Sequence, residues 1–468
     1  MQLLRRLFAA EYMVPADRVC GELPSTRQAY RDNLAVAWPS ALEAFLVALI
    51  ASVDTVMVGA IGPEAISAVG ITTQPKLIVL SIIFSLNVGV TTIVARRRGE
   101  DDQTSANRCL RQSVLLSAAL SFVLGALAYR FAPQLLRFAG AGSDILFDAV
   151  VYFRIILIGN FFYSISLTIN AAQRGVGHTK ISMVTNLTAN LVNLVFNYLL
   201  IGGNFGFPRW GVMGAAVATA LGNFLACVMS VYSVCNHRSG FLHLRLRDSW
   251  RLDRSAIGQI FSICSGALIE QVIMRVGFFS YAKIVAGLGT IPFAAHQIVM
   301  NVLSISFSFG DGLGIASAAL VGQSLGARRP DLAILYGHVG QRIGAVISCL
   351  LCVIFIGLRL PIISIFNSSP DILRLGGPLM IITGIACLPQ VSSTIYSGCL
   401  RGAGDVMYVA VMSFISIGLI RPCLSWLLCY PLGLGLNGAW YGLLTDQITR
   451  LVLYAHRFVS GRWTDIKV

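Results

Sequence analysis

Long apolar segments, each interrupted by few charges, recur along the whole chain. Each is long enough to cross the hydrocarbon core of a bilayer as a helix, which takes about 20 residues. The strict apolar and polar alternation of a membrane β-barrel is not seen. The pattern predicts an all-α integral membrane protein whose twelve transmembrane helices lie near residues 34–60, 65–95, 110–130, 146–171, 181–203, 211–235, 255–286, 292–325, 332–357, 373–398, 405–430 and 436–457.

The composition supports lipid as the solvent of these helices. Hydrophobic residues make up 56% of the 468 residues and charged residues only 12%, which is more apolar surface than a soluble core can bury. The first 33 residues carry several arginines and prolines but no long apolar stretch, so they are expected to be a cytosolic or interfacial segment. The eleven cysteines lie mostly inside the expected helices without clustered histidines, so neither disulfides nor metal sites are expected.

The net charge of +14 could indicate nucleic-acid binding, but the positions of the cations indicate topology instead. Most of the 35 Lys and Arg residues fall in the N-terminus, the even-numbered connections and the C-terminus. In the odd-numbered connections the basic residues are Arg130, Arg137, Arg209, Arg359 and Arg374. By the positive-inside rule, both termini and the long 236–254 connection face the cytoplasm.

An internal repeat divides the chain into two halves. Shifted by 227 residues, Glu43 falls on Glu270, and the "RGVG" beginning at Arg174 falls on the "RGAG" beginning at Arg401. Two six-helix bundles in the same orientation, related by a pseudo-twofold axis along the membrane normal, form a transporter architecture with the substrate path between them. The predicted organisation is an N-terminal segment 1–33, an N-lobe 34–235, a cytosolic linker 236–254, a C-lobe 255–457 and a cytosolic tail 458–468.

A carboxylate stands in the first apolar run, "FLVALIASVDTVMVGAIG", as Asp54. An ionisable group in the membrane costs about 2.5 kcal/mol or more on insertion scales, so it needs a partner, a wet cavity or a function. Glu43 lies eleven residues earlier, which returns it to nearly the same helix face. On the fifth helix, a single polar stripe follows the spacing i, i+4, i+7, i+11, namely Asn186, Asn190, Asn193 and Asn197.

These residues predict an ion-coupling site at Asp54, with the amide stripe as its wall. Protonation of a carboxylate in a cavity that opens to one side at a time would be coupled to that opening, and carboxylate and amide oxygens could equally hold sodium. The alternative is a neutralised ion pair, for instance with Lys76. Glu270 is a second candidate, and Glu43 and Asp311 are further intramembrane acids without a favoured interpretation.

Three further features of the sequence concern ion pairing, helix bending and the source of energy. Asp446 lies four residues before Arg450, which predicts a salt bridge on a helix surface. Residues that bend helices occur in the long second and eighth helices, and the hinge candidates are Pro75, Gly310, Gly312 and Gly314. No phosphate-binding loop motif is present, so an ion gradient or the gradient of the substrate itself must supply the energy.

Several motifs, in order, resemble one family, the multidrug and toxic compound extrusion (MATE) transporters. "VDTVMVGAIGPEAISAVGI" at 53–71 is similar to the first-helix signature of that family. "AAQRGVGHTKISM" at 171–183 and "GCLRGAGDVMY" at 398–408 resemble its paired loops, and "LVGQSLGARR" at 320–329 resembles its second-lobe loop. The resemblance runs from about residue 34 to 457.

The resemblance implies a twelve-helix fold with a central cavity, and export of organic, often cationic compounds in exchange for protons or sodium. It implies cation coupling by Asp54 in the N-lobe and by Glu270 in the C-lobe. Two fifth-helix positions of the family, an Asn and then, in some members, an Asp, correspond to Asn193 and Asn197. The second position is therefore an amide in this chain, which has one formal charge fewer at the site than those members. The tenth helix lacks the Asp that often accompanies the seventh-helix Glu in this family, which counts against a C-lobe cation site unless Asp311 takes the place of that Asp.

The expected function is therefore secondary active efflux across the plasma or inner membrane, driven through Asp54, with protons as the first choice. Expected partners are small organic substrates and the bilayer, in a monomer, with no cofactor or metal beyond a coupling proton or a sodium ion at Asp54. A lipid-linked saccharide flippase of the same superfamily is the alternative, because Arg154, Arg275, Lys283 and Arg421 could make a cationic cavity. A membrane enzyme is not expected, because the six histidines are scattered along the chain.

Overall fold

The computed structural model describes residues 8–59, 61–142, 145–236, 240–245, 248, 250–367 and 369–466. Parts of the predicted N-terminal segment, linker and tail therefore lie outside the described residues.

Twelve long helical segments make up most of this described chain, and each of the twelve predicted stretches falls on one of them. They are α2 (Thr26–Gly59), α3 (Pro63–Gly99), α4 (Gln103–Arg130), α6 (Leu146–Gly175), α7 (Thr179–Gly202), α8 (Gly211–Cys235), α9 (Arg254–Ala286), α10 (Thr290–Gly326), α11 (Pro330–Gly357), α13 (Pro370–Ala403), the composite α14 (Val406–Ser413), η4 (Phe414–Ile420) and α15 (Arg421–Cys429), and α16 (Gly435–Ser460). Short helices connect them at η1 (Ala10–Tyr12), η2 (Ala16–Arg18), α5 (Ala132–Phe138), η3 (Asn204–Gly206) and α12 (Arg359–Phe366). The predicted all-α membrane fold is confirmed.

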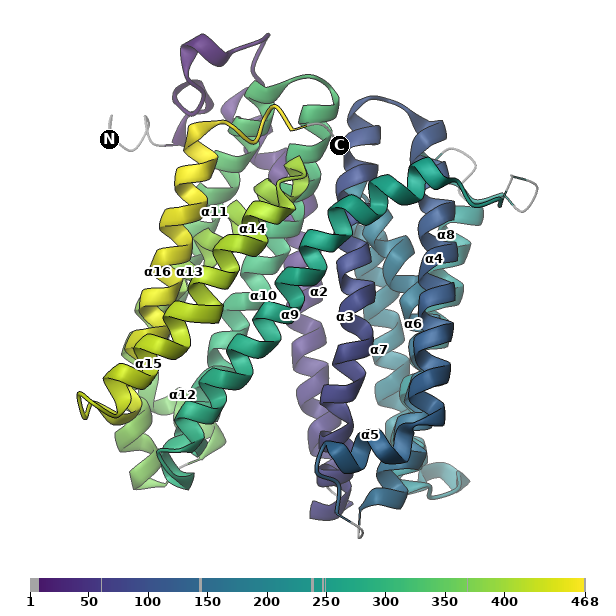
Figure 1. The fold of residues 1–468 in the computed structure, drawn as a ribbon, viewed down its shortest axis with the longest axis vertical. Coiled ribbons are helices and arrows are strands. Elements are labelled where there is room, and N and C mark those ends of the chain that lie inside the picture. The colour runs from purple at the N-terminus through teal and green to yellow at the C-terminus, as the bar shows by residue number, and fades with distance from the viewer. Residues whose placement is uncertain are drawn as a thin grey trace. The chain divides into compact units, whose positions relative to one another are not determined.

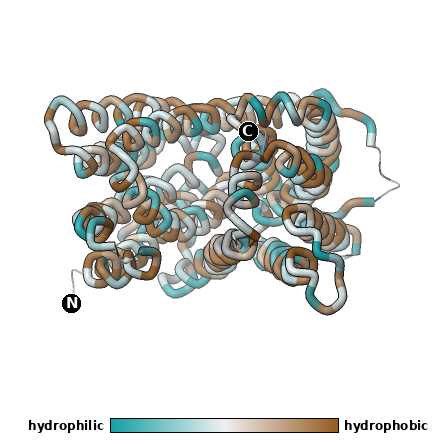
Figure 2. Tube along the Cα trace, turned by 90° about the horizontal axis from the view of Figure 1, so that it is seen from below, coloured by the Kyte–Doolittle hydropathy of each residue, from teal (hydrophilic) through white to brown (hydrophobic). Residues whose placement is uncertain are grey.

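Among the described helices, eleven contain a window apolar enough to cross a membrane. The long helix outside that set is α16, which carries Asp446 and Arg450. Hydrophobic residues (brown in Figure 2) line most turns of the helices, and hydrophilic residues interrupt them. Large apolar side chains such as Phe279 (73% exposed) and Val353 (70% exposed) lie on the outside. Such a surface fits contact with lipid tails.

The eleventh predicted helix is not a uniform α-helix, because its middle, η4, has π-helical hydrogen bonding. Pro422 follows one residue after the start of α15 and has no N–H to donate, while its ring crowds the carbonyl four residues earlier. A wider turn immediately before the proline relieves this conflict. Wide turns of this kind often accompany functional residues.

The chain divides into two compact units, Leu42–Cys264 and a second unit of Met1–Ala41 with Ser265–Val468. The boundaries fall inside α2 and α9, whereas the predicted boundary between the lobes 34–235 and 255–457 lies in the linker. Pro39 lies inside α2 close to one boundary, where its missing N–H interrupts the helical hydrogen bonds. The first half of α2 therefore packs in a different unit from the half that carries Asp54.

In the unit Leu42–Cys264, α6 packs against α3, α4 and α8, and α7 packs against α8 (Figure 1). Small residues allow these helices to approach closely. A Cβ added at Gly222 of α8 would lie 2.7 Å from the Ala189 carbonyl oxygen of α7. Such contacts are typical of helix pairs in membranes, and here they bring the polar face of α7 close to α8.

In the other unit, α10, α13 and α16 run side by side (Figure 1). A Cβ at Gly312 would lie 2.5 Å from Ala41, and one at Gly314 would lie 3.0 Å from the Thr394 carbonyl oxygen. Gly310 also faces Thr394, at 3.3 Å. These three glycines thus provide close packing, and their role as hinges, like that of Pro75 inside α3, stays a prediction.

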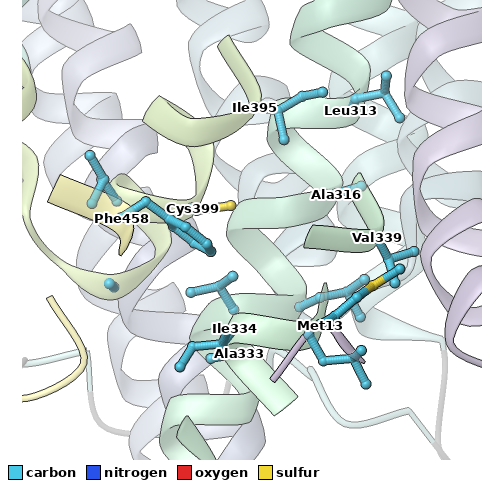
Figure 3. Packing of buried hydrophobic residues seen from close by; sticks show 14 of the residues in the cluster. Met13, Leu313, Ala316, Ala333, Ile334, Val339, Ile395, Cys399 and Phe458 are labelled. Atoms are coloured by element: carbon cyan, nitrogen blue, oxygen red, sulfur yellow. The ribbon is translucent and has the colours of Figure 1, made fainter. Parts of the chain in front are cut away.

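The described part of the N-terminal segment, from residue 8, packs onto this same unit. Figure 3 shows Met13 among buried apolar residues of α11, including Ala333 and Val339. Arg329 also donates to the Glu22 carbonyl oxygen at 2.9 Å and to Asp331 at 2.8 Å. The hydrogen bonds to Asp331 hold the pKa of the Arg329 guanidinium above its usual value. The segment is therefore part of the core of this unit.

Candidate ion-coupling site

Asp54 lies in the second half of α2, where α7 and α8 place polar groups around it. Its Oδ1 accepts a hydrogen bond from Asn197 Nδ2 at 2.8 Å. When the Asn193 amide is oriented to satisfy its neighbours, its nitrogen donates to both Asp54 oxygens, at 3.1 and 2.9 Å. Its oxygen then accepts from the N–H and the hydroxyl of Thr219, both at 3.0 Å. The predicted grouping of Asp54, Asn193 and Asn197 is therefore present.

The spacing of the two asparagines explains this geometry. They are four residues apart on α7, so both side chains project from one helix face toward α2. Both amides are buried, whereas Asp54 is half-buried. Among the described side chains, Asp54 forms an ion pair with neither Lys76 nor another base. The carboxylate is held by neutral donors, and the alternative of a neutralised ion pair is not seen.

Glu43 lies at the other end of the polar stripe of α7. Its Oε1 accepts from Asn186 Nδ2 at 2.5 Å and from the Ser182 hydroxyl at 3.4 Å. Arg174, from the end of α6, lies 3.8 Å from Glu43 and donates to Ser182 at 2.9 Å. The end of α6 and the first turns of α7 therefore both contact this acid of α2.

Glu270 of α9 has an equivalent but tighter environment in the other unit. Arg401 donates to its Oε1 at 2.6 Å, and the Ser413 hydroxyl lies 3.4 Å away. Ser413 is also 2.9 Å from the Tyr454 hydroxyl. The glutamate, the arginine and the third residue of the two clusters are related by the internal repeat (43 to 270, 174 to 401 and 186 to 413). The repeat aligns both motifs in the sequence, but the duplicated Glu–Arg pair is not predicted from it.

Asp446 lies in a different environment from the one that its spacing to Arg450 predicts. It does contact Arg450, at 3.5 Å, but it is fully buried rather than on a helix surface. Its main partner is Arg421, which is also buried, and the Ser416 hydroxyl of η4 donates to the same carboxylate. The guanidinium of Arg421 lies over the ring of Phe278. Arg421 is thus neutralised inside the protein and does not line a cationic cavity.

Asp311 of α10 lies on the surface of its unit. Its charge attracts Arg401, the partner of Glu270. The structure therefore places Asp311 in the electrostatic neighbourhood of the Glu270 pair. Arg154, another cation considered for the flippase alternative, stacks over Tyr129, 4.9 Å from its ring centroid.

The two halves of the chain each match the model of one known family. The MatE family model matches residues 39–199 and again residues 267–427. The chain belongs to the MATE family of transporters. The two matches, which begin 228 residues apart (39 to 267), also confirm the internal repeat. Membership, together with the apolar helices, makes this a multi-pass membrane protein of the MATE family.

Two curated relatives match nearly the whole chain. "Probable multidrug resistance protein NorM" from Thermotoga maritima is 28% identical over 94% of this chain and 94% of its own length. "Multidrug resistance protein MdtK" from Photorhabdus laumondii is 26% identical over 93% of this chain and 95% of its own length. A solved structure described as an outward-facing multidrug resistance MATE family transporter has a TM-score of 0.86 at 20% identity, covering 93% of this chain and 95% of that chain. That structure supports the twelve-helix fold.

Proposed function

We propose that this MATE protein is a secondary active efflux transporter for small organic, often cationic compounds. The names of its NorM and MdtK relatives, which match over almost the full length, support export of drug-like molecules. The same names favour export over the flipping of a lipid-linked saccharide. The cation distribution in the sequence supports a cytoplasmic location of both termini, in the plasma or inner membrane, and we expect a monomer.

The coupling ion that fits the Asp54 site best is the proton. The amide nitrogens of Asn193 and Asn197 both point at the carboxylate, so they stabilise its charge by donating to it. Sodium needs oxygen ligands, and the Asn193 oxygen is already engaged by Thr219. To present that oxygen to a cation, the amide would have to turn and give up its donation to Asp54, whereas a proton needs only one oxygen of Asp54.

The remaining acids have weaker claims to coupling. For Glu270 to bind a cation, it would first have to release Arg401, because a guanidinium already neutralises it. Asp311 lies on the surface of its unit and close to the same arginine. We therefore assign coupling to Asp54, with Asn193 and Asn197 as its direct partners and Thr219 as the residue that orients Asn193.

The observation that carries this proposal is that Asp54 accepts hydrogen bonds from two amides and has no ion-pair partner among the described residues. Dye transport into proteoliposomes tests the proposal. We would compare the wild-type protein with Asp54→Asn, and use Asp148→Asn as a control because Asp148 is an exposed acid of the same unit. Ethidium, rhodamine 6G and berberine serve as cationic aromatic probes, under an imposed pH gradient or an imposed sodium gradient.

We expect a pH gradient to drive at least one dye in the wild-type and Asp148→Asn proteins, and not in Asp54→Asn. Transport by Asp54→Asn at the wild-type rate would show that the site is misassigned. Movement driven by sodium alone would contradict proton coupling. If neither gradient moves any dye through the wild-type protein, the export of cationic aromatic compounds is wrong.

A further inference from the structure

The two acids of α2 in the unit Leu42–Cys264 are joined by one helix face. Glu43 and Asp54 are eleven residues apart on nearly the same side of α2, about 16 Å along its axis. The stripe of α7 spans this distance and contacts both acids, through Asn186 at one end and Asn197 at the other. Between them, Asn190 donates to the Asn186 carbonyl oxygen at 2.8 Å. One face of α7 therefore carries polar side chains that contact both acids, and Asn190 lies between these contacts along the helix.

The surroundings of Glu43 suit a group that takes up and gives up a proton. Its Oε2 is buried and has no hydrogen-bond partner among the described residues, while Oε1 is shared by Asn186 and Ser182. The charged and titratable groups around it are Arg174 and Tyr163, both from α6. Arg174 lies 3.8 Å away and binds Ser182 more closely than it binds the glutamate. The free oxygen leaves room for a proton without breaking a contact.

The internal repeat supplies a built-in comparison. In the other unit, the position equivalent to Asp54 is Tyr281, and those equivalent to Asn190, Asn193 and Asn197 are Ile417, Ile420 and Leu424. At these equivalent positions Glu270 therefore has neither a second acid nor an amide stripe, and its arginine is 2.6 Å away. Both glutamates have an arginine partner. Only Glu43, which is the more loosely paired of the two, lies on a helix that also carries a coupling carboxylate.

We propose that Glu43 is a second proton-binding group, on the N-terminal side of the path from Asp54. The proton leaves the Asp54 carboxyl, passes through water ordered by the α7 amides, and binds the Glu43 carboxylate. Asp54 is then a carboxylate again, and Glu43 releases the proton at the membrane face where α2 begins. This inference rests on the proposed proton coupling at Asp54, and on the cytosolic location expected for that face.

Glu43→Gln tests the proposal, with Glu270→Gln as the matched control and Asn190→Leu as an interruption of the stripe. Each variant is measured in proteoliposomes for dye transport driven by a pH gradient across a range of pH, and for dye exchange at equal pH on both sides. Exchange requires substrate binding and the conformational change but no net proton transfer. A thermal unfolding curve in detergent accompanies each protein.

We expect Glu43→Gln to slow gradient-driven transport by about tenfold or more, and Asn190→Leu to slow it as well. Both variants should keep the wild-type rate of dye exchange and the wild-type unfolding temperature. Glu43→Asp should restore part of the gradient-driven transport. Glu270→Gln should not show slowed driven transport together with normal exchange. Driven transport at the wild-type rate in Glu43→Gln would overturn the proposal, and so would an equal loss of exchange. Asp54→Asn separates the two ideas: if Asp54→Asn is inactive while Glu43→Gln is normal, only the role of Glu43 fails.

Discussion

The buried pair of Arg421 and Asp446 yields a stability prediction that can be worked out from its contacts. Asp446 is 0% exposed and Arg421 is 1% exposed. Changing Arg421 to Met would leave the carboxylate with the Ser416 hydroxyl and with Arg450, which is 3.5 Å away. Breaking one side of a buried pair typically costs about 3–5 kcal/mol, and the contact with Arg450 should offset part of that cost.

The effect of Asp446→Leu should be of similar size, softened by the contact of Arg421 with the face of Phe278, 5.0 Å from its ring centroid. The double variant removes both charges and fills the space with apolar atoms. Such replacements are often neutral or stabilising, so we expect the double variant to lose less stability than either single variant.

The free energy of unfolding, measured by SDS titration in mixed micelles for all four proteins, completes a double-mutant cycle. The reasoning predicts a coupling energy of several kcal/mol between the two residues. Single-variant losses that simply add in the double variant would refute it, because they would mean that each charge is stabilised independently of the other.

Three further predictions concern other parts of the chain. Asn197→Asp should place a second carboxylate beside Asp54, so the pH of half-maximal transport should rise by about one unit or more, since two adjacent carboxylates resist full ionisation; an unchanged pH profile contradicts this. Gly312→Val should lower the unfolding temperature because its Cβ would meet Ala41 at 2.5 Å, whereas an unchanged temperature would show that the helices can separate at no cost. Asp102 caps α4 by accepting from the Ser105 N–H, which holds the pKa of Asp102 below its usual value. Asp102→Ala should therefore lower the free energy of unfolding by about 1 kcal/mol near pH 7, and this difference from the wild type should vanish as the pH falls through the lowered pKa. Equal losses of stability at pH 7 and at strongly acid pH would disprove this.

The helices and the Asp54 site could be predicted from the sequence because both follow from local periodicity. Apolar runs of the length of a bilayer fix the helices, and the spacing of Asn193 and Asn197 places both amides on one helix face. Asp54 of α2 could be matched to that face of α7 because few other polar groups lie at the same depth along the apolar helices. These inferences need only the geometry of a single helix.

The ion pairs were harder to predict because they join residues far apart in the sequence. Glu43 of α2 and Arg174 at the end of α6 are brought together only in the folded unit, which no local pattern encodes. Asp446 has Arg450 one turn away, so a surface salt bridge is the simplest interpretation of the sequence. The burial of Asp446 depends on Arg421, 25 residues earlier on the neighbouring helix α15, which donates to its carboxylate. The one available signal was the repeat, which aligns both glutamates and both arginines.

The central claim is that Asp54 exchanges a proton for substrate, and proton release on substrate binding tests it most directly. The purified protein in weakly buffered detergent is mixed with the dye that it transports, and a pH indicator reports the protons released at several starting pH values. We predict close to one proton released per bound dye over part of the pH range for the wild-type protein, and none for Asp54→Asn, although that variant still binds the dye. Dye binding to the wild-type protein with no proton release at any pH, or unchanged release by Asp54→Asn, would contradict the account.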